Sequence, residues 1–320
     1  MAMILSIIVP VFNVRQYLGR CVDSLLNQDI DKEKYEIILV DDGSTDGCGE
    51  LCDAFAIQEK NIKVLHQENQ GLSVARNSGL EIALGAFIQF VDSDDFLQPN
   101  VLSFLVETME NGRLDILRFG FRRVYEGENN SIEERACSQL QIERVWEGKE
   151  FLLKKLWFTC YACQFIIRRA ILETNHLRFK PGIIFEDTEW TPRVLAVSQR
   201  VSNTDLVVYN YLIREGSITN SSVEYKVLGQ LVLIDELKSQ MDLFEDTRWH
   251  RGMISQIVVS IISTVSKSLF HQRKKYLRLL LEKRIYPLSS YLASDSGLRK
   301  IRIINFSPLL ACYLIHIFNK

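Results

Sequence analysis

The chain has 320 residues, of which 47% are hydrophobic and 24% are charged. These proportions are typical of a globular protein with a large core, and they exclude a disordered or collagen-like chain. The formal net charge is −2, but residues 248–320 carry thirteen Lys and Arg against two acids, a balance of +11 that leaves −13 for residues 1–247. A basic C-terminal region on an otherwise acidic chain suggests that this region binds an anionic partner.

The cysteines and the apolar segments bear on metal binding and location. Cys160 and Cys163 form one pair and Cys48 and Cys52 a looser one, which together would supply four zinc ligands. No histidine lies near these pairs, so small buried thiols of a reducing compartment are the favoured interpretation. The sequence shows neither an export signal nor an uninterrupted run of about 20 apolar residues. We therefore expect a cytoplasmic protein or one peripheral at the inner face of the membrane.

Apolar strand patterns alternate with helical patterns through the first half of the chain. Strands are expected over residues 4–11, 35–40, 61–65, 86–91 and 115–121, and helices over 17–26, 72–84 and 101–109. Near-continuous apolar strands separated by helices predict an α/β fold whose parallel sheet is covered on both faces. In such sheets ligands bind beyond the carboxyl ends of the strands.

The second half of the chain changes from mixed to helical patterns. Residues 123–145 are polar and predict an excursion or edge hairpin. Helices near 147–157 and 187–198 and strands near 164–168 and 201–211 follow. From residue 222 the pattern is helical, with one apolar stripe formed by Ile254, Ile257, Val258, Ile261, Ile262, Val265 and Leu269. We therefore predict one domain over 1–221 and a helical, basic region over 222–320.

An acidic cluster, Asp92-Ser93-Asp94-Asp95, follows the fourth expected strand. Carboxylates crowded on one turn repel each other, and a hard divalent cation relieves the repulsion. Mn²⁺ or Mg²⁺ held by one or two carboxylates takes its other ligands from substrate phosphates and water. The alternative is an Asx-type turn that caps the next helix. These four residues alone favour neither interpretation.

Three further segments have a functional and a structural interpretation. Taken by itself, the 41–46 segment, which starts at Asp41, is typical of a turn that caps a helix. Together with the acidic cluster after the fourth strand, however, it gives two acidic strand ends in one sheet, and these would face the same crevice. Arg76, one turn into a helix, would neutralise a phosphate or simply be exposed. Glu186 and Asp187 precede an apolar helix face, where a carboxylate either caps the helix or acts as a general base.

Five segments, taken together and in order, resemble the inverting glycosyltransferases of family two, which have the nucleotide-diphospho-sugar (GT-A) fold. They are residues 6–13, 40–46, 70–77, 91–95 and 185–187. The similarity spans about residues 3–220 and implies a GT-A type Rossmann-like sheet, mixed but mostly parallel, flanked by helices. Residues 222–320 carry no motif that we can assign.

The resemblance implies roles for individual residues. The nucleotide pocket would be lined by Pro10, Val11 and Asn13, with Asp41 accepting a hydrogen bond from the base, usually uracil. Arg76 would contact the base or diphosphate, and Asp92 and Ser93 the ribose side of the donor. Asp94 would bind the metal, Mn²⁺ or Mg²⁺, with Asp95 beside it. The catalytic base would be Asp187 with Glu186 as its neighbour, and a later segment containing Tyr209, Tyr211, Arg214 and Ser217 would close over the diphosphate.

The implied reaction moves a sugar from a nucleoside-diphosphate-sugar to a hydroxyl of a glycan or lipid-linked acceptor, with inversion. A sugar-phosphate nucleotidyltransferase is an alternative, but it should carry a Gly- and Arg-rich loop after the first strand, and residues 10–15 contain no glycine. A second alternative is a catalytically silent nucleotide-binding or membrane-adaptor module. The presence of Asp94 and Asp187 argues against this alternative. The sequence leaves the oligomeric state open.

The basic helical region has two interpretations that the sequence does not separate. Its basic residues concentrate at 273–275, 283–284 and 299–302, the last of which leads into an apolar run over 303–318. Such a helix would lie on an anionic membrane surface. Alternatively, the helices form a bundle packed on the catalytic domain with solvated Lys and Arg outside. Nucleic acid is not expected as a partner, because no binding motif or aromatic-basic pattern appears.

Overall fold

The computed structural model describes residues 2–126, 132–135, 144–153, 160–214, 222–266 and 270–312. The chain divides into two compact units. The first unit comprises residues 1–151, 160–182 and 190–215, and the second unit comprises 152–159, 183–189 and 216–320. The domain boundary expected between 221 and 222 falls at the edge of a segment, 215–221, that lies outside the described residues.

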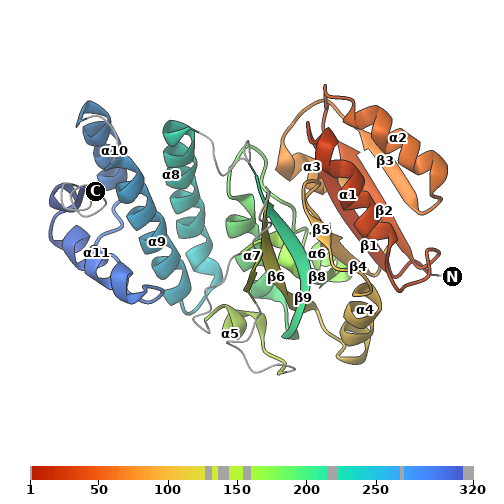
Figure 1. Cartoon of the computed structure of the whole chain (residues 1–320). Coiled ribbons are helices and arrows are strands. Elements are labelled where there is room, and N and C mark those ends of the chain that lie inside the picture. The colour runs from red at the N-terminus through yellow and green to blue at the C-terminus, as the bar shows by residue number, and fades with distance from the viewer. Residues whose placement is uncertain are drawn as a thin grey trace. The chain divides into compact units, whose positions relative to one another are not determined.

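The first unit is built on a sheet whose first four strands are parallel. They are β1 (Leu5–Val11), β2 (Tyr35–Asp41), β3 (Ile62–His66) and β4 (Phe87–Phe90), in the spatial order β3-β2-β1-β4. Figure 1 shows β1, β2 and β3 side by side. β1 and β2 end in register, Val11 opposite Asp41, so the segments that follow both strands start at the same edge. The four strands expected from the apolar runs are confirmed.

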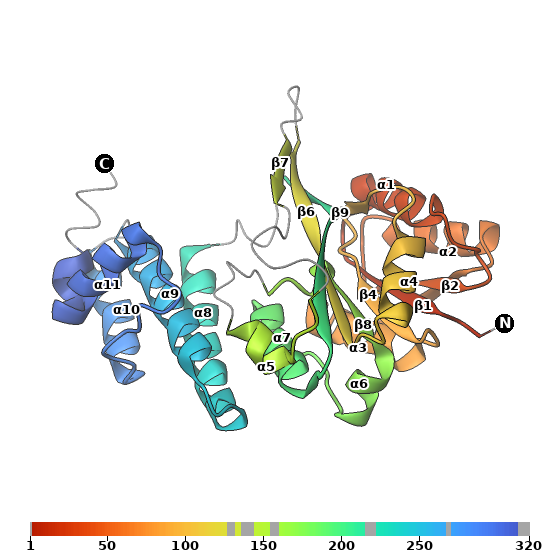
Figure 2. The same cartoon turned by 90° about the horizontal axis from the view of Figure 1, so that it is seen from below.

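The rest of the sheet is mixed. β8 (Phe165–Arg168) pairs antiparallel with β4 and with β6 (Ile116–Tyr125), while β9 (Val201–Ile213) runs parallel to β6. A two-residue strand, β5 (Phe96–Leu97), pairs antiparallel with β9. β7 (Ile132–Arg135) pairs antiparallel with β6, as Figure 2 shows, which confirms the edge hairpin. The wholly parallel sheet suggested by the apolar runs is wrong for this half, whereas the mixed sheet implied by the resemblance is confirmed.

Helices cover both faces of this sheet, as predicted. α1 (Arg15–Leu26), α2 (Cys48–Gln58) and α4 (Leu102–Asn111) share one buried core with the odd-numbered residues of β1. α3 (Leu72–Ile82) packs on the other face, where Gly79 lies against Ile8 so closely that a Cβ would collide with the Ile8 side chain. α6 (Arg169–Thr174) follows β8, and α5 (Gly148–Leu152) and α7 (Glu186–Val197) match two expected helices, although residues 154–157 lie outside the described part.

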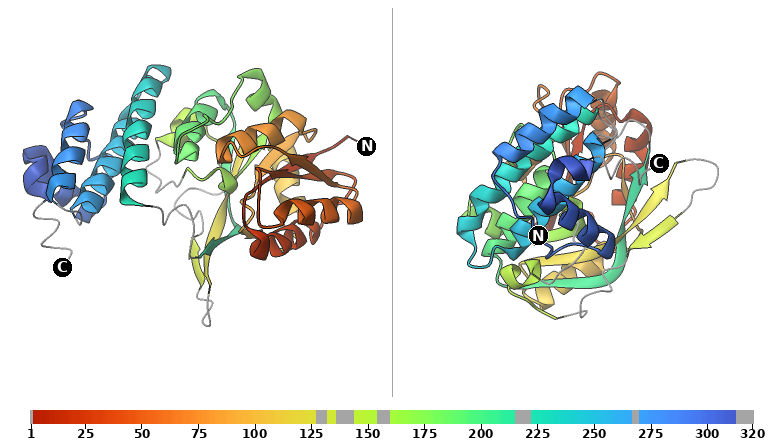
Figure 3. Two further views of the ribbon diagram at one scale, coloured as in Figure 1. Left: turned by 90° about the horizontal axis from the view of Figure 1, so that it is seen from above. Right: turned by 90° about the vertical axis from the view of Figure 1, so that its left-hand side faces the viewer.

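The second unit is helical, as predicted from residue 222 onward. Its main helices are α8 (Val223–Gln240), α9 (Arg248–Val265), α10 (Phe270–Glu282) and α11 (Asp295–Phe306). Figure 3 shows α8 and α9 side by side. The predicted stripe from Ile254 to Val265 is buried along α9, while Leu269 and the end of the 303–318 run lie outside the described residues. Within the described helices, none combines the length and apolar character needed to cross a membrane.

Candidate active site

Asp41 marks the carboxyl end of β2 and is held by two contacts. Its Oδ1 accepts a hydrogen bond from the Ser44 backbone N–H at 3.1 Å, and its Oδ2 lies 3.0 Å from Nδ1 of His66. The other ring nitrogen of His66 lies 3.0 Å from Oδ1 of Asp53. Hydrogen bonds to Asp53 first, and then to Asp41, raise the pKa of His66. A histidine that favours its charged form therefore sits beside the carboxylate expected to meet the base.

Asn13 links the segments that follow β1 and β2. Its backbone has φ 52°, a left-handed conformation that asparagine adopts more readily than most residues. Its side-chain oxygen accepts a hydrogen bond from the Thr45 N–H at 2.8 Å, and its own N–H donates to Ser44 Oγ at 3.2 Å. Pro10 and Val11 are buried at the end of β1. These expected nucleotide-binding residues thus lie at the same sheet edge as Asp41.

Asp42 is a residue whose importance the sequence interpretation missed. Its Oδ1 accepts hydrogen bonds from Gln70 N at 2.9 Å and Gln67 Nε2 at 2.6 Å, and its Oδ2 accepts one from Gly71 N at 2.8 Å. The carboxylate therefore fixes the segment that leads into α3, the helix that carries Arg76. Only its position next to Asp41 could have indicated this role.

Arg76 reaches the second acidic strand end. It is 3% exposed, and its Nη2 lies 2.8 Å from Oδ1 of Asp92. The Arg76 guanidinium carbon lies 5.2 Å from the ring centre of Phe179. The alternative of an exposed helical arginine is therefore wrong, since this guanidinium is buried beside a carboxylate of the predicted site.

Asp95 anchors the acidic turn to β9. The side chain is 1% exposed, and its oxygens accept hydrogen bonds from Tyr209 Oη and from the Leu212 N–H, both at 2.7 Å. Tyr209 Oη in turn accepts a hydrogen bond from the Asp92 N–H at 3.1 Å. Because both carboxylate oxygens accept hydrogen bonds from β9, Asp95 holds the acidic turn in place, and each oxygen keeps a second lone pair. Ser93, between the aspartates, is also buried.

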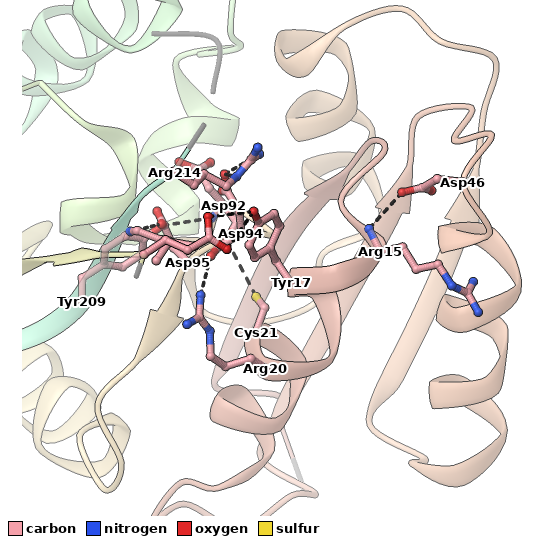
Figure 4. A network of polar contacts seen from close by, with 12 residues as sticks. Arg15, Tyr17, Arg20, Cys21, Asp46, Asp92, Asp94, Asp95, Tyr209 and Arg214 are labelled. Atoms are coloured by element: carbon pink, nitrogen blue, oxygen red, sulfur yellow. Dashed lines mark hydrogen bonds and ion pairs between the residues drawn. The ribbon is translucent and has the colours of Figure 1, made fainter. Parts of the chain in front are cut away.

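Asp94, like Asp92, pairs with an arginine of the protein itself. Its Oδ2 lies 2.7 Å from Nη2 and 2.8 Å from Nε of Arg214, at the end of β9. The same guanidinium lies over the ring of Tyr17, with its carbon 4.7 Å from the ring centre. Figure 4 shows Arg214 and Asp94 next to Asp92 and Asp95. One turn thus offers carboxylates to two arginines, Arg76 and Arg214.

The chemistry of this turn suits a hard divalent cation. Burial, and next the charge of Asp92, raise the pKa of Asp94, which reflects negative charge crowded in a partly buried place. Among the residues that the structure describes, no three His, Cys, Asp or Glu side chains form a metal-holding group on their own. A cation bound here would therefore draw further ligands from donor phosphates and water, as Mg²⁺ commonly does.

The cysteines that the structure describes take no part in such a group. The six cysteines in the described part of the chain are free and buried, as the sequence favoured, and Cys137 lies outside that part. Burial raises the pKa of Cys48 to about 11 and that of Cys52 to about 12, so both thiols stay protonated near neutral pH.

Glu186 and Asp187 form the first turn of α7 and belong to the second unit. Asp187 Oδ1 accepts a hydrogen bond from the Thr188 N–H at 2.7 Å, and Glu186 is buried. Acids in the first turn are favourable for any helix, because they face the positive end of its dipole. The structure groups the other predicted site residues that it describes in the first unit, whereas Ser217 lies outside the described residues. The catalytic role of Glu186 and Asp187 stays a prediction.

Comparisons with known proteins agree with this architecture. The family model for Glycosyl transferase family 2 matches residues 6–175, which is just over half of the chain. The uncharacterized glycosyltransferase EpsJ of Bacillus subtilis (strain 168) is 34% identical over 229 residues, which are 70% of this chain and 64% of that protein. This chain therefore matches less than two thirds of EpsJ.

Two solved structures share the fold at low sequence identity. S. aureus TarS in complex with UDP-GlcNAc gives a TM-score of 0.71 at 19% identity, covering 98% of this chain and 89% of that one. The mannosyltransferase PcManGT from Pyrobaculum calidifontis, in complex with GDP-Man and Mn²⁺, gives 0.55 at 14% identity, covering 100% and 88%. These similarities confirm the expected GT-A type fold. The family match over residues 6–175 establishes that the chain belongs to glycosyl transferase family 2.

Proposed function

We propose that this protein transfers a sugar from a nucleoside-diphosphate-sugar, in the first instance a UDP-sugar, to a hydroxyl of a glycan or lipid-linked acceptor. The observation that carries the proposal is the acidic turn after β4, where Asp92 and Asp94 contact Arg76 and Arg214 at the sheet edge that also holds Asp41. Carboxylates and guanidinium groups gathered at the carboxyl ends of strands suit a metal-bound diphosphate. Family membership and the UDP-GlcNAc complex of TarS support the same donor class.

The proposed donor site assigns one task to each group. Pro10, Val11 and Asn13 line the nucleotide pocket, and Asp41 accepts a hydrogen bond from the base. Asp92 and Ser93 hold the ribose side, and Asp94 provides the ligand for Mn²⁺ or Mg²⁺, with Asp95 keeping the turn in place. The bound cation offsets the charge that grows on the departing diphosphate. Arg76 and Arg214 supply positive charge to the same group.

The proposed transfer is a single displacement with inversion. Asp187 takes the proton of the acceptor hydroxyl, and the hydroxyl oxygen attacks the anomeric carbon opposite the leaving diphosphate. Glu186, its neighbour in the first turn of α7, orients this carboxylate. Against the nucleotidyltransferase alternative, residues 10–15 contain no glycine, and α1 already begins at Arg15.

A thermal-shift screen of nucleotides and nucleotide-sugars, with and without Mn²⁺, tests this proposal. Binding of the matching donor should raise the melting temperature by mass action. This rise should be seen only when Mn²⁺ is present. Metal-dependent release of the nucleoside diphosphate then separates an enzyme from a silent binding module. A protein that responds to no nucleotide-sugar at any metal concentration would contradict the proposal.

For the basic helices we propose contact with an anionic membrane surface. Arg299 and Arg302 on α11 are exposed, and Phe306 and Leu309 just beyond them are 82% and 51% exposed. Exposed apolar side chains next to basic ones are the pattern of interfacial helices. Co-sedimentation with vesicles of anionic lipid at moderate salt tests this, and an absence of binding there would refute it.

A further inference from the structure

A pocket of about 260 Å³ lies wholly within the second unit. Its walls come from the end of α8, the first half of α9 and the segment that follows α10. The volume is just below the range of about 300–1,000 Å³ that is usual for small-molecule sites. The pocket therefore has room for a small organic molecule rather than for a single ion only.

The charged residues around this pocket are all positive. Lys238, Arg251 and Arg284 line it, and no aspartate or glutamate does. None of the three forms an ion pair with a carboxylate of the described residues: Lys238 donates to the Lys283 carbonyl at 2.8 Å, and Arg251 donates to Thr247 Oγ1 at 3.2 Å. Asp235, on the same helix as Lys238, pairs with Lys283. All three residues are exposed, so solvent screens their mutual repulsion, and an anion that enters the pocket meets three positive groups.

Tyr286 adds a buried donor to the same pocket. Tyr286 is one of the lining residues, and its hydroxyl is buried without a hydrogen-bond partner among the residues that the structure describes. A buried polar group without a partner is destabilising, and a bound acceptor removes that penalty. Burial also raises the pKa of Tyr286 to about 12, so the hydroxyl keeps its proton and can donate it in a hydrogen bond at neutral pH. Met241 and Ile254 give the pocket an apolar wall.

We propose that this pocket binds a phosphate ester, that is, the phosphate group of a phosphorylated sugar or polyol. The phosphate lies against Arg251 and Arg284, whose planar guanidinium groups match phosphate oxygens, and Tyr286 donates a further hydrogen bond. The carbon chain of the ester packs on Met241 and Ile254. Use of the site to hold a phosphorylated acceptor rests on the proposed transferase function, whereas binding of the ester does not.

The test measures binding of glycerol 3-phosphate to the full chain by calorimetry at low salt, with glycerol and inorganic phosphate as comparisons. The Arg251→Gln/Arg284→Gln variant should bind the ester about tenfold more weakly, because charge-assisted hydrogen bonds are lost. The Lys275→Gln/Arg278→Gln variant removes two charges from α10 outside the pocket and should bind as the wild type does. Tyr286→Phe should weaken binding several-fold without lowering the melting temperature of the free protein.

Several results would overturn the proposal. One is equal weakening in both double variants, which would indicate a diffuse electrostatic effect. Another is equal affinity for inorganic phosphate and the ester, and a third is binding only to phosphatidylglycerol vesicles, which would indicate a lipid headgroup. Binding of UDP with Mn²⁺, measured in the same variants, is expected to be unchanged. A wild type that binds the ester but no nucleotide-sugar would defeat the transferase proposal and leave this one standing.

Discussion

Arg214 and Asp94 form an ion pair across 120 residues of sequence, with Nη2 and Oδ2 2.7 Å apart. The arginine directly follows β9, and the aspartate lies in the turn after β4. In the proposed site this aspartate is the metal ligand, so a positive side chain neutralises the very carboxylate that a divalent cation would bind. A metal bound by Asp94 would therefore compete with Arg214 for this carboxylate, and Arg214 would then be available to the donor diphosphate.

We predict that Arg214→Gln has opposite effects on metal and donor. Without the competing guanidinium, Mn²⁺ alone should bind several-fold more tightly, because Asp94 has lost its counter-charge. The UDP-sugar in the presence of Mn²⁺ should bind about tenfold more weakly, because the diphosphate has lost a charged donor. Calorimetry with each ligand measures both. Arg20→Gln is the matched control, since Arg20 donates to the Asp94 backbone carbonyl at 3.3 Å and lies over the ring of Phe96, away from the carboxylate oxygen that Arg214 contacts. Weaker Mn²⁺ binding in Arg214→Gln would refute the competition.

Substitution of the two proposed key aspartates should separate binding from chemistry. Asp94→Ala and Asp187→Ala should each lose transfer, and for Asp187 the loss should be about 10²–10⁴-fold, as for other general bases. Only Asp94→Ala should also weaken metal-dependent donor binding, because Asp187 acts on the acceptor. Transfer assays together with donor titrations measure the split. Asp242→Asn, an exposed acid of the second unit, serves as the control, and an equal loss of donor binding in both alanine variants would contradict the assignment.

The sequence was informative where structure is local and uninformative where it depends on distant partners. The parallel strands and α1, α3 and α4 followed from apolar spacing, because burial on a strand or helix leaves a period in the sequence. β5 has only two residues, Phe96 and Leu97, and a segment of that length has no period. The antiparallel direction of β8 was also hidden, since an apolar run is the same in either direction. Asp41, Asp92 and Asp94 are predicted as site residues from their place after strands, whereas the partnership of His66 with Asp41 depends on how β2 and β3 pair.

Tyr209→Phe should destabilise the acidic turn without changing the sheet. The change removes a hydroxyl that donates to Asp95 and accepts from the Asp92 N–H, and leaves both groups buried without that partner. Each unsatisfied buried group costs about 1–3 kcal/mol, so chemical denaturation should show a clear loss of unfolding free energy. Tyr211→Phe is the control, because Tyr211 contributes its ring, stacked on Tyr161 at 6.1 Å, rather than a hydroxyl contact at this turn. Equal losses in the two variants would contradict the role given to the Tyr209 hydroxyl.

His66 should make part of the stability depend on pH. Its pKa in the folded protein is raised above the ordinary 6.5 by Asp53 and then Asp41. The contribution is therefore fully present below about pH 6.5 and is lost as the pH rises through the folded value. Because the side chain is 48% exposed, the effect should be small. The difference in unfolding free energy between the wild type and His66→Gln should shrink as the pH rises, and Asp53→Asn should reduce it; a difference that grows with pH would contradict this assignment.

Two helical glycines should respond in opposite ways to alanine. In α3, a Cβ on Gly79 would overlap the Ile8 side chain in the sheet, so Gly79→Ala should force a shift that costs about 1–3 kcal/mol of stability. In α1, nothing lies within 4 Å of a Cβ on Gly19, so Gly19→Ala should stabilise by about 0.5–1 kcal/mol through helix propensity alone. Because α3 also carries Arg76, the displacement in Gly79→Ala should weaken donor binding as well, which Gly19→Ala should leave unchanged. A stable Gly79→Ala with normal donor affinity would show that α3 does not need its close approach to β1 to position the arginine.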